Sequence, residues 1–393
     1  MNPFFSDYDT PFGVPPFDLI ENEHFIPAAK TGFSEQKAEI EYIVSNQEAP
    51  TFENTIEAYL LSGELLRKVD GVFGRLVSAN KTDEIDSIAK ILVPMKAVHT
   101  SEINLYEGLF ERVKTVYENQ QAMDLSPEQK VVLEKVYKKF VRAGADLDET
   151  GKKRISEIDE KLSTLTLQFG NNLLAETNNY QLIIENEEDL AGLPASVRSA
   201  ASDAAKAAGL EGKWVFTLHK PSWIPFLMYA EKRSLREEIY KAMYTRCNTG
   251  NEYDNNELIK EILKLRLERA NLLGYGNHAA YILEERMARE PETVYDFLLQ
   301  VWEPALRKSK EEARMMQEMI DNEGGDFQLA SWDWWYYAEK IRQEKYQLDE
   351  EEVRAYFSLD AVTEGLFEVV NKLYGITLEL RTDLPVYHEE VLP

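Results

Sequence analysis

Apolar and polar residues alternate with the period of an α-helix along most of the chain beyond residue 52. In residues 257–276, ELIKEILKLRLERANLLGYG, the apolar positions recur every three or four residues, which places them on one helix face. This run reaches Gly274 and Gly276, residues that commonly end a helix because they tolerate a left-handed backbone. The pattern predicts a series of amphipathic helices separated by short breaks.

The breaks carry helix-start signals. Ser126 precedes a proline and is followed three residues later by Gln129, the spacing of a reciprocal capping box, so a helix is expected to begin there. The same spacing occurs twice more, at Asp254 with Glu257 and at Asp349 with Glu352. We therefore expect helices to start after each of these three positions.

Only two segments read as strands, residues 180–185 (YQLIIE) and 213–218 (KWVFTL), and an alanine-rich helix over about 195–208 is expected between them. The proline-rich first 50 residues are expected to be extended and to wrap the helical body. The prediction is a mainly α fold, a large helical body with a small β insert. Its parts are an N-terminal arm plus helical region (1–175), a β/α insert (176–220) and a second helical region (221–393).

Composition excludes several function classes. The chain has 70 acidic and 44 basic residues and a formal charge of −26, so it is expected to repel nucleic acid and an anionic membrane surface. No apolar run reaches the length of a membrane span, and the first residues lack the pattern of a signal peptide. These features predict a soluble protein, cytoplasmic or periplasmic, whose leader, if any, is not part of the sequence.

Histidine is scarce and widely spaced, and no two histidines lie within five residues of each other. The five are His24, His99, His219, His278 and His388. A helical zinc motif of the HExxH type at His388 would need a second histidine at 392, where the chain has leucine. We therefore predict no metal site and no catalytic residue in this chain.

Nucleophilic chemistry is equally poorly supported. Cys247 is the single cysteine, which excludes an internal disulfide and a thiolate zinc cluster, and a lone cysteine in a helical context is more often a small buried residue. No GxSxG elbow and no glycine-rich phosphate loop is present. The many acidic pairs are interpreted as solvated helix faces.

The aromatic block is residues 332–346, WDWWYYAEKIRQEKY. Its rings either fill the core of the helical body or line a groove for an extended peptide, and the sequence leaves both open. The candidates for a substrate-channel wall are Trp334, Trp335, Tyr336 and Tyr337. Asp333 inside the block either holds its surroundings by hydrogen bonds or caps the helix.

Segments along the whole chain resemble the thimet oligopeptidase and peptidyl-dipeptidase family of zinc metallopeptidases. The resemblance is carried by residues 216–288, beginning FTLHKPSWIPF, and by residues 332–379. The bacterial peptidyl-dipeptidase branch in particular is similar at NPFF (2–5), TPFGVPPFD (10–18) and TFENTIEA (51–58).

The resemblance implies a helical ellipsoid with a deep channel and zinc at its floor, held by an HExxH helix and a further glutamate downstream of the segment LPVYHEEVLP. By the same resemblance, Tyr387 and His388 lead toward that catalytic half, and His388 matches no zinc ligand. This chain is then expected to be the N-terminal, channel-wall portion, with no zinc bound to it and short peptides as the substrates of the full-length enzyme.

Two functions follow. In the first, the full-length protein releases C-terminal dipeptides from oligopeptides, and this chain is its part without catalytic residues. The alternative is a self-standing helical module that binds peptides or a partner without hydrolysis. In the first case an apolar surface that the catalytic part would cover is expected to promote self-association of this chain.

Overall fold

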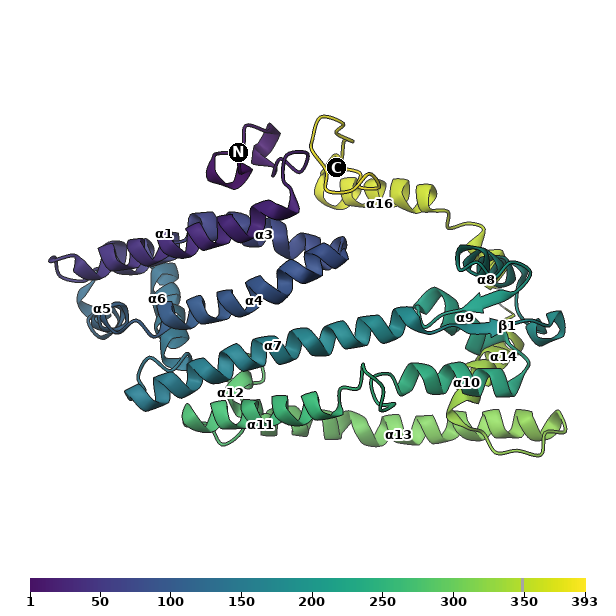
Figure 1. Ribbon diagram of the computed structural model, residues 1–393. Coiled ribbons are helices and arrows are strands. Elements are labelled where there is room, and N and C mark those ends of the chain that lie inside the picture. Colours follow the sequence, from purple (N-terminus) through teal and green to yellow (C-terminus); the bar gives the residue numbers. More distant parts are fainter. Residues whose placement is uncertain (348–349) are drawn as a thin grey trace. The chain divides into compact units, whose positions relative to one another are not determined.

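The computed structural model describes residues 1–347 and 350–393 and is mainly α (Figure 1). Two short strands, β1 (Leu182–Ile184) and β2 (Trp214–Phe216), form the sheet. The α-helices, in chain order, are α1 (Phe25–Ser45), α2 (Ala58–Leu61), α3 (Glu64–Ala79), α4 (Asp83–Asn104), α5 (Glu107–Glu118), α6 (Pro127–Arg142), α7 (Glu149–Asn179), α8 (Ala195–Ala207), α9 (Lys220–Tyr229), α10 (Arg233–Tyr244), α11 (Asn256–Leu272), α12 (His278–Leu283), α13 (Pro291–Asn322), α14 (Trp334–Tyr346), α15 (Glu350–Arg354) and α16 (Leu359–Tyr374). The predicted fold class is confirmed.

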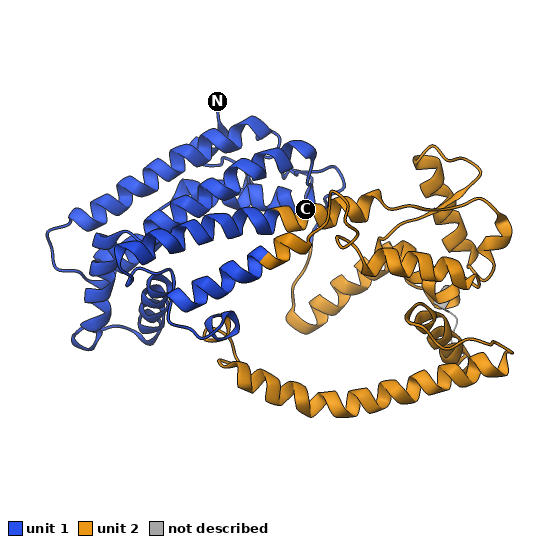
Figure 2. Ribbon diagram, turned by 60° about the horizontal axis from the view of Figure 1, so that its bottom comes forward, with its two compact units in different colours: residues 1–167, 261–281, 379–393 blue, residues 168–260, 282–378 orange. Residues whose placement is uncertain are grey.

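The chain divides into two compact units, coloured separately in Figure 2. Unit 1 comprises residues 1–167, 261–281 and 379–393, and unit 2 comprises residues 168–260 and 282–378. The division at 175 and 220 that we expected from the sequence stays a prediction. Within the described residues, no helix combines the length and the hydropathy needed to cross a bilayer.

Unit 1 contains a helix where the sequence led us to expect an extended arm. Residues 25–45 form α1, so the prediction for that segment is wrong. Pro27 lies in the first turn, where no backbone N–H is required, and therefore does not prevent the helix. Apolar residues at helical spacing, from Ala28 to Ile43, then bury one face of α1. Of the other prolines in the first 50 residues, Pro3 and Pro11 lie in short 3₁₀ turns before residue 25, and Pro50 lies in the break after Ser45.

Close packing of α1 on α3 depends on a glycine. A Cβ atom added at Gly32 would lie 2.9 Å from Leu66 Cγ, a separation that real Cβ contacts do not show. At the start of α1, the Phe25 ring contacts the rings of Phe4 and Phe73 at centroid distances of 5.5 and 5.1 Å. Unit 1 thus builds an aromatic core between its first residues and α3.

In unit 2 the expected strands and the helix between them are confirmed. The strands are antiparallel, with Leu182 opposite Phe216 and Ile184 opposite Trp214, and α8 lies between them in the chain. Their buried side chains share one hydrophobic cluster with α9 and α10, which includes Phe226 and Ile239. The residues expected to form a separate insert therefore take part in a larger core.

The three predicted helix starts had different outcomes. At Ser126 the capping box forms as expected, because the Ser126 Oγ accepts from Gln129 N at 3.2 Å and Gln129 Oε1 accepts from Ser126 N at 2.9 Å. At Asp254 the prediction is wrong by one residue. Helix α11 begins at Asn256, and Asn255 supplies the first carbonyl acceptor, to Ile259 N. Asp349 lies outside the described residues, so the third start stays a prediction.

Candidate functional site

The aromatic block is built into unit 2 through two different contacts. Tyr337 is 5% exposed and packs with Met316 and Ile320 of α13, and Trp334 is partly buried in the same cluster. Trp335 faces the other way along α14 and meets Trp223 of α9 edge to face at a centroid distance of 6.2 Å. The block therefore joins α14 to both neighbouring helices, and the channel role of its four rings stays a prediction.

Asp333 is fully buried at the start of this block and holds its surroundings by hydrogen bonds. Its carboxylate accepts from Arg233 at 2.8 Å, from Arg236 at 2.8 Å and from the backbone N–H of Ala330 at 3.0 Å. It makes no side-chain cap on α14. The carboxylate thus holds its surroundings by hydrogen bonds, and through Ala330 it also caps the 3₁₀ turn η7 (Ser331–Asp333) directly before α14. The paired carboxylate also raises the pKa of Arg233 above its usual value.

The two arginines lie one helical turn apart on α10 and stack on aromatic rings. Arg236 lies over the Tyr336 ring at 4.2 Å, and Arg233 lies over the Phe327 ring at 4.3 Å. Arg236 also donates to the carbonyl of Ala230 at 2.7 Å. Sequence reasoning missed both arginines. Their spacing of three residues on a helix was visible, but their partner lies about a hundred residues away in the chain.

Trp334 lines an open groove of about 340 Å³ between α13 and α14. The rest of the apolar lining comes from the adjacent residues Met315 and Met316 of α13 and from Ala338 and Ile341 of α14, which follow Trp334 at spacings of four and three residues. Of the four predicted channel residues, only Trp334 lines this groove. A small apolar groove with charged residues at its edge is the form of many peptide and small-molecule sites.

The histidines do not come together into a two-histidine site within the described residues. His99 is buried and its Nε2 lies 2.7 Å from Gln36 Oε1, and burial lowers its pKa. His278 is also partly buried with a lowered pKa, whereas His219 is exposed beside Thr217. His388 is exposed, and its Nδ1 accepts from the backbone of Glu390. Each ring therefore has its own local environment.

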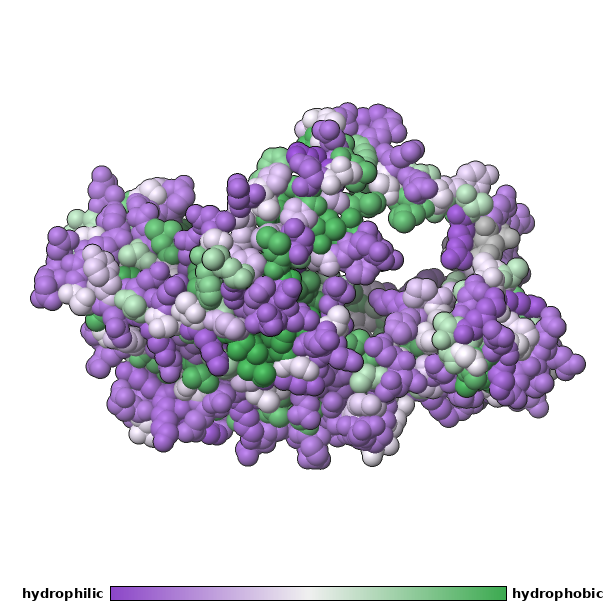
Figure 3. Space-filling model, turned by 45° about the horizontal axis from the view of Figure 1, so that its top comes forward, coloured by the Kyte–Doolittle hydropathy of each residue, from purple (hydrophilic) through white to green (hydrophobic). Residues whose placement is uncertain are grey.

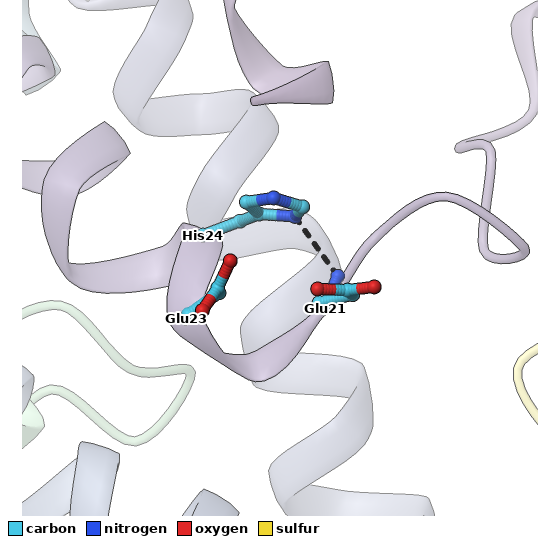
Figure 4. A group of neighbouring side chains, drawn as sticks. All are labelled: Glu21, Glu23 and His24. Atoms are coloured by element: carbon cyan, nitrogen blue, oxygen red, sulfur yellow. Dashed lines mark hydrogen bonds between the residues drawn. The ribbon is translucent and has the colours of Figure 1, made fainter. Parts of the chain in front are cut away.

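Glu21, Glu23 and His24 are the one group of three potential metal ligands found among the described residues (Figure 4). Their ligand atoms lie within 4.8 Å of one another, and both carboxylates are exposed. His24 Nδ1 already accepts from the backbone N–H of Glu21 at 3.0 Å, as part of a reciprocal cap on the turn η3 (Asn22–His24). Local turn geometry accounts for the group, and it lacks the two histidines of an HExxH site.

Cys247 is buried, as expected for a small packing residue. It is 5% exposed, and its backbone N–H donates to Glu176. Burial, followed by the nearby Glu176 carboxylate, raises the pKa of the thiol to about 11. Because the thiolate is the nucleophilic form, this protonated thiol is unsuited to nucleophilic catalysis near neutral pH.

The segment leading up to the end of the chain packs in unit 1. The Tyr387 ring meets Phe17 edge to face at a centroid distance of 5.7 Å, and Arg381 lies over the Phe12 ring at 5.2 Å. Residues 10–18, which resemble the bacterial peptidyl-dipeptidases, are therefore in contact with the segment that contains Arg381 and Tyr387. His388, next to Tyr387, belongs to no group of three potential metal ligands among the described residues.

Comparison with known proteins agrees with the resemblance seen in the sequence. Residues 226–392 match the family described as Peptidase family M3. The chain is 34% identical over 392 residues to the dipeptidyl carboxypeptidase of Escherichia coli strain K12, an alignment that covers 100% of this chain and 58% of that protein. It is 32% identical over 386 residues to oligopeptidase A of Salmonella typhimurium, covering 97% of this chain and 57% of that protein.

A more distant match extends the group to a eukaryote. Saccharolysin of Saccharomyces cerevisiae is 26% identical over 364 residues, which covers 88% of this chain and 49% of that protein. The chain thus spans between about half and three fifths of the length of these relatives. The resemblance to the M3 peptidases is confirmed, and in general that family depends on zinc.

Proposed function

We propose that this chain, a relative of the M3 peptidases along its whole length, forms the non-catalytic, peptide-facing part of an enzyme that releases C-terminal dipeptides from short oligopeptides. The observation that carries the proposal is the alignment of all of its residues with 58% of a dipeptidyl carboxypeptidase. The composition supports it, because a strongly acidic chain is unsuited to nucleic acid. The aromatic block, with Trp334 at a groove, provides apolar surface for peptide side chains.

The residues present do not fit the zinc site that such chemistry needs. A catalytic zinc is held by three protein ligands, in this family two histidines of one helix and a glutamate, and leaves a position for water. The sequence contains no HExxH, and the group at Glu21, Glu23 and His24 offers a single histidine that already accepts a backbone hydrogen bond. We therefore assign no catalytic role to the residues of this chain and propose that the chain is inactive alone.

Hydrolysis is the direct test. With an N-acylated tripeptide as substrate and zinc supplied, we expect the 393-residue chain to release no dipeptide above the rate without protein. The dipeptidyl carboxypeptidase of Escherichia coli, assayed in parallel, is the positive control. Adding a zinc chelator to the control should abolish its product. Zinc-dependent release of dipeptide by the chain itself would contradict the proposal.

We also propose that copies of this chain associate with one another through exposed apolar helices. Helix α16 contains no buried residue, although Leu359, Val362, Leu366, Val369 and Leu373 recur at three and four residues along it. Figure 3 shows hydrophobic residues at the surface along this part of the chain. An amphipathic helix of this kind is normally covered by another element. We propose that the catalytic part of the enzyme covers it and that copies of the isolated chain cover it for one another.

Changing this face to charged residues should therefore reduce association. Sedimentation velocity of the chain is expected to show a weight-average mass that rises with concentration. The double variant Leu366→Lys with Leu373→Lys should sediment as a monomer, because lysine on the apolar face opposes its burial. Glu364→Lys, on the opposite side of the same helix, is the control and should associate like the parent chain. A parent chain that stays monomeric at high concentration would refute the proposal.

A further inference from the structure

Helix α13 carries one apolar stripe along its length, and only the C-terminal part of that stripe is covered. There, Met316 and Ile320 lie in one cluster with Tyr337 of α14. Trp302 and Leu306 precede Met316 and Ile320 by two heptads each, so they lie on the same face of the helix. None of the residues 291–310 is buried. The first half of α13 therefore presents, uncovered, the same face that packs against α14 further along the helix.

The uncovered half of the stripe consists of large side chains. Tyr295 is 66% exposed, Leu299 61%, Trp302 60% and Leu306 37%. They follow one another at spacings of four, three and four residues. An apolar face of this extent marks a site where another element packs.

Helix α16 has a face of matching spacing. Four apolar residues recur along it at spacings of four, three and four, namely Val362, Leu366, Val369 and Leu373, and α16 contains no buried residue. The two faces can meet in four layers, as in a coiled coil, either antiparallel with Leu366 opposite Trp302 or parallel with Leu366 opposite Leu299. Since neither face is buried within one chain, a second copy can supply the partner for each.

Charges near the ends of the two helices select the antiparallel arrangement. In it, Lys372 lies level with Asp296, and Asp360 lies level with Lys308. The parallel arrangement would instead set Asp360 level with the acidic first turns of α13, between Glu292 and Asp296. Lys308 and Lys372 each already form an exposed ion pair within their own helix, so these charges orient the helices and add little affinity.

We propose that two copies of this chain associate reciprocally, with the first half of α13 of each copy covered by α16 of the other in an antiparallel helix pair. The inference rests on the self-association in the proposed function and names the surface that α16 meets. Because each copy provides one α13 and one α16, the two contacts close a symmetric pair and leave no face for further growth.

Sedimentation velocity of two double variants, alone and mixed, tests this pairing. Leu299→Lys with Trp302→Lys on α13, and Leu366→Lys with Leu373→Lys on α16, should each sediment as a monomer at concentrations where the parent chain has twice the monomer mass. An equimolar mixture of the two should recover the species of twice the monomer mass, because a mixed pair keeps one intact α13 and one intact α16. With one contact in place of two, the mixed pair should form at a higher concentration than the parent pair.

Phe297→Lys with Gln300→Lys is the matched control, because it adds two lysines to α13 away from the stripe, and it should associate like the parent chain. Parent-like association of the α13 double variant, a mixture that stays monomeric, or a monomeric control would each overturn the pairing and leave association through α16 standing. A parent chain that is monomeric at every concentration would refute self-association itself. The dipeptide-release assay is independent of all these outcomes.

Discussion

Replacing Asp333 with alanine is expected to lower the free energy of unfolding of unit 2 by about 3–5 kcal/mol, because it leaves a buried guanidinium without its anion. The side chain of Arg236 is 2% exposed and that of Asp333 is not exposed at all. Water therefore cannot replace the lost carboxylate. The backbone N–H of Ala330 would also lose its acceptor.

Tryptophan fluorescence during urea unfolding measures this effect in the correct unit. All six tryptophans of the chain, Trp214, Trp223, Trp302, Trp332, Trp334 and Trp335, lie in unit 2. The control is Asp203→Ala, which removes an acid whose side chain is 67% exposed and pairs with Lys206. That change should hardly alter the urea concentration at the midpoint of unfolding. A midpoint for Asp333→Ala equal to that of the control would show that the buried ion pairs do not stabilise unit 2.

Replacing Phe226 with alanine should also lower the free energy of unfolding of unit 2 by about 3–5 kcal/mol, because it opens a cavity in a packed core. Phe226 is fully buried on α9 and contacts the Phe216 ring of β2 at a centroid distance of 4.5 Å. It belongs to the cluster shared by the two strands, α8, α9 and α10. Losing this ring weakens the attachment of the sheet to the helices.

The same fluorescence measurement reports this change, and α13 supplies a matched substitution. Phe297 is 64% exposed, so Phe297→Ala in the same unit should alter the free energy of unfolding by no more than about 0.5 kcal/mol. If Phe226→Ala lowers the free energy of unfolding no more than Phe297→Ala does, the cluster does not stabilise unit 2 as its burial indicates.

Local structure could be predicted where neighbouring residues determine it. The capping box at Ser126 depends on side chains within three residues of one another, and the strands at 182–184 and 214–216 follow from short apolar, β-branched runs. The same reasoning failed for residues 25–45. Proline content over a wide window indicated an extended chain, whereas the position of Pro27 within the first turn was what mattered for α1.

The candidate site could be predicted only in part. The aromatic block was visible because its residues are adjacent, and the sequence left open whether the rings fill a core or face a groove. The structure buries Tyr337 against α13, and Trp334, three residues away on α14, is partly buried in the same cluster and lines a groove between α13 and α14. Helical spacing alone does not tell which neighbour each face will meet.

By itself, the sequence determined the mainly α class, the helices that begin near residues 127, 195 and 256, the acidic charge, the scarcity of histidine pairs and the resemblance to the M3 peptidases. These features depend on local pattern or on aligned residues. Tertiary structure alone decided that Asp333 pairs with Arg233 and Arg236, that Lys345 stands beside Met315, and that α16 is left with an exposed apolar face. The contacts of Asp333 and Lys345 join residues far apart in the chain. Their energies depend on burial, which cannot be deduced from a local sequence pattern.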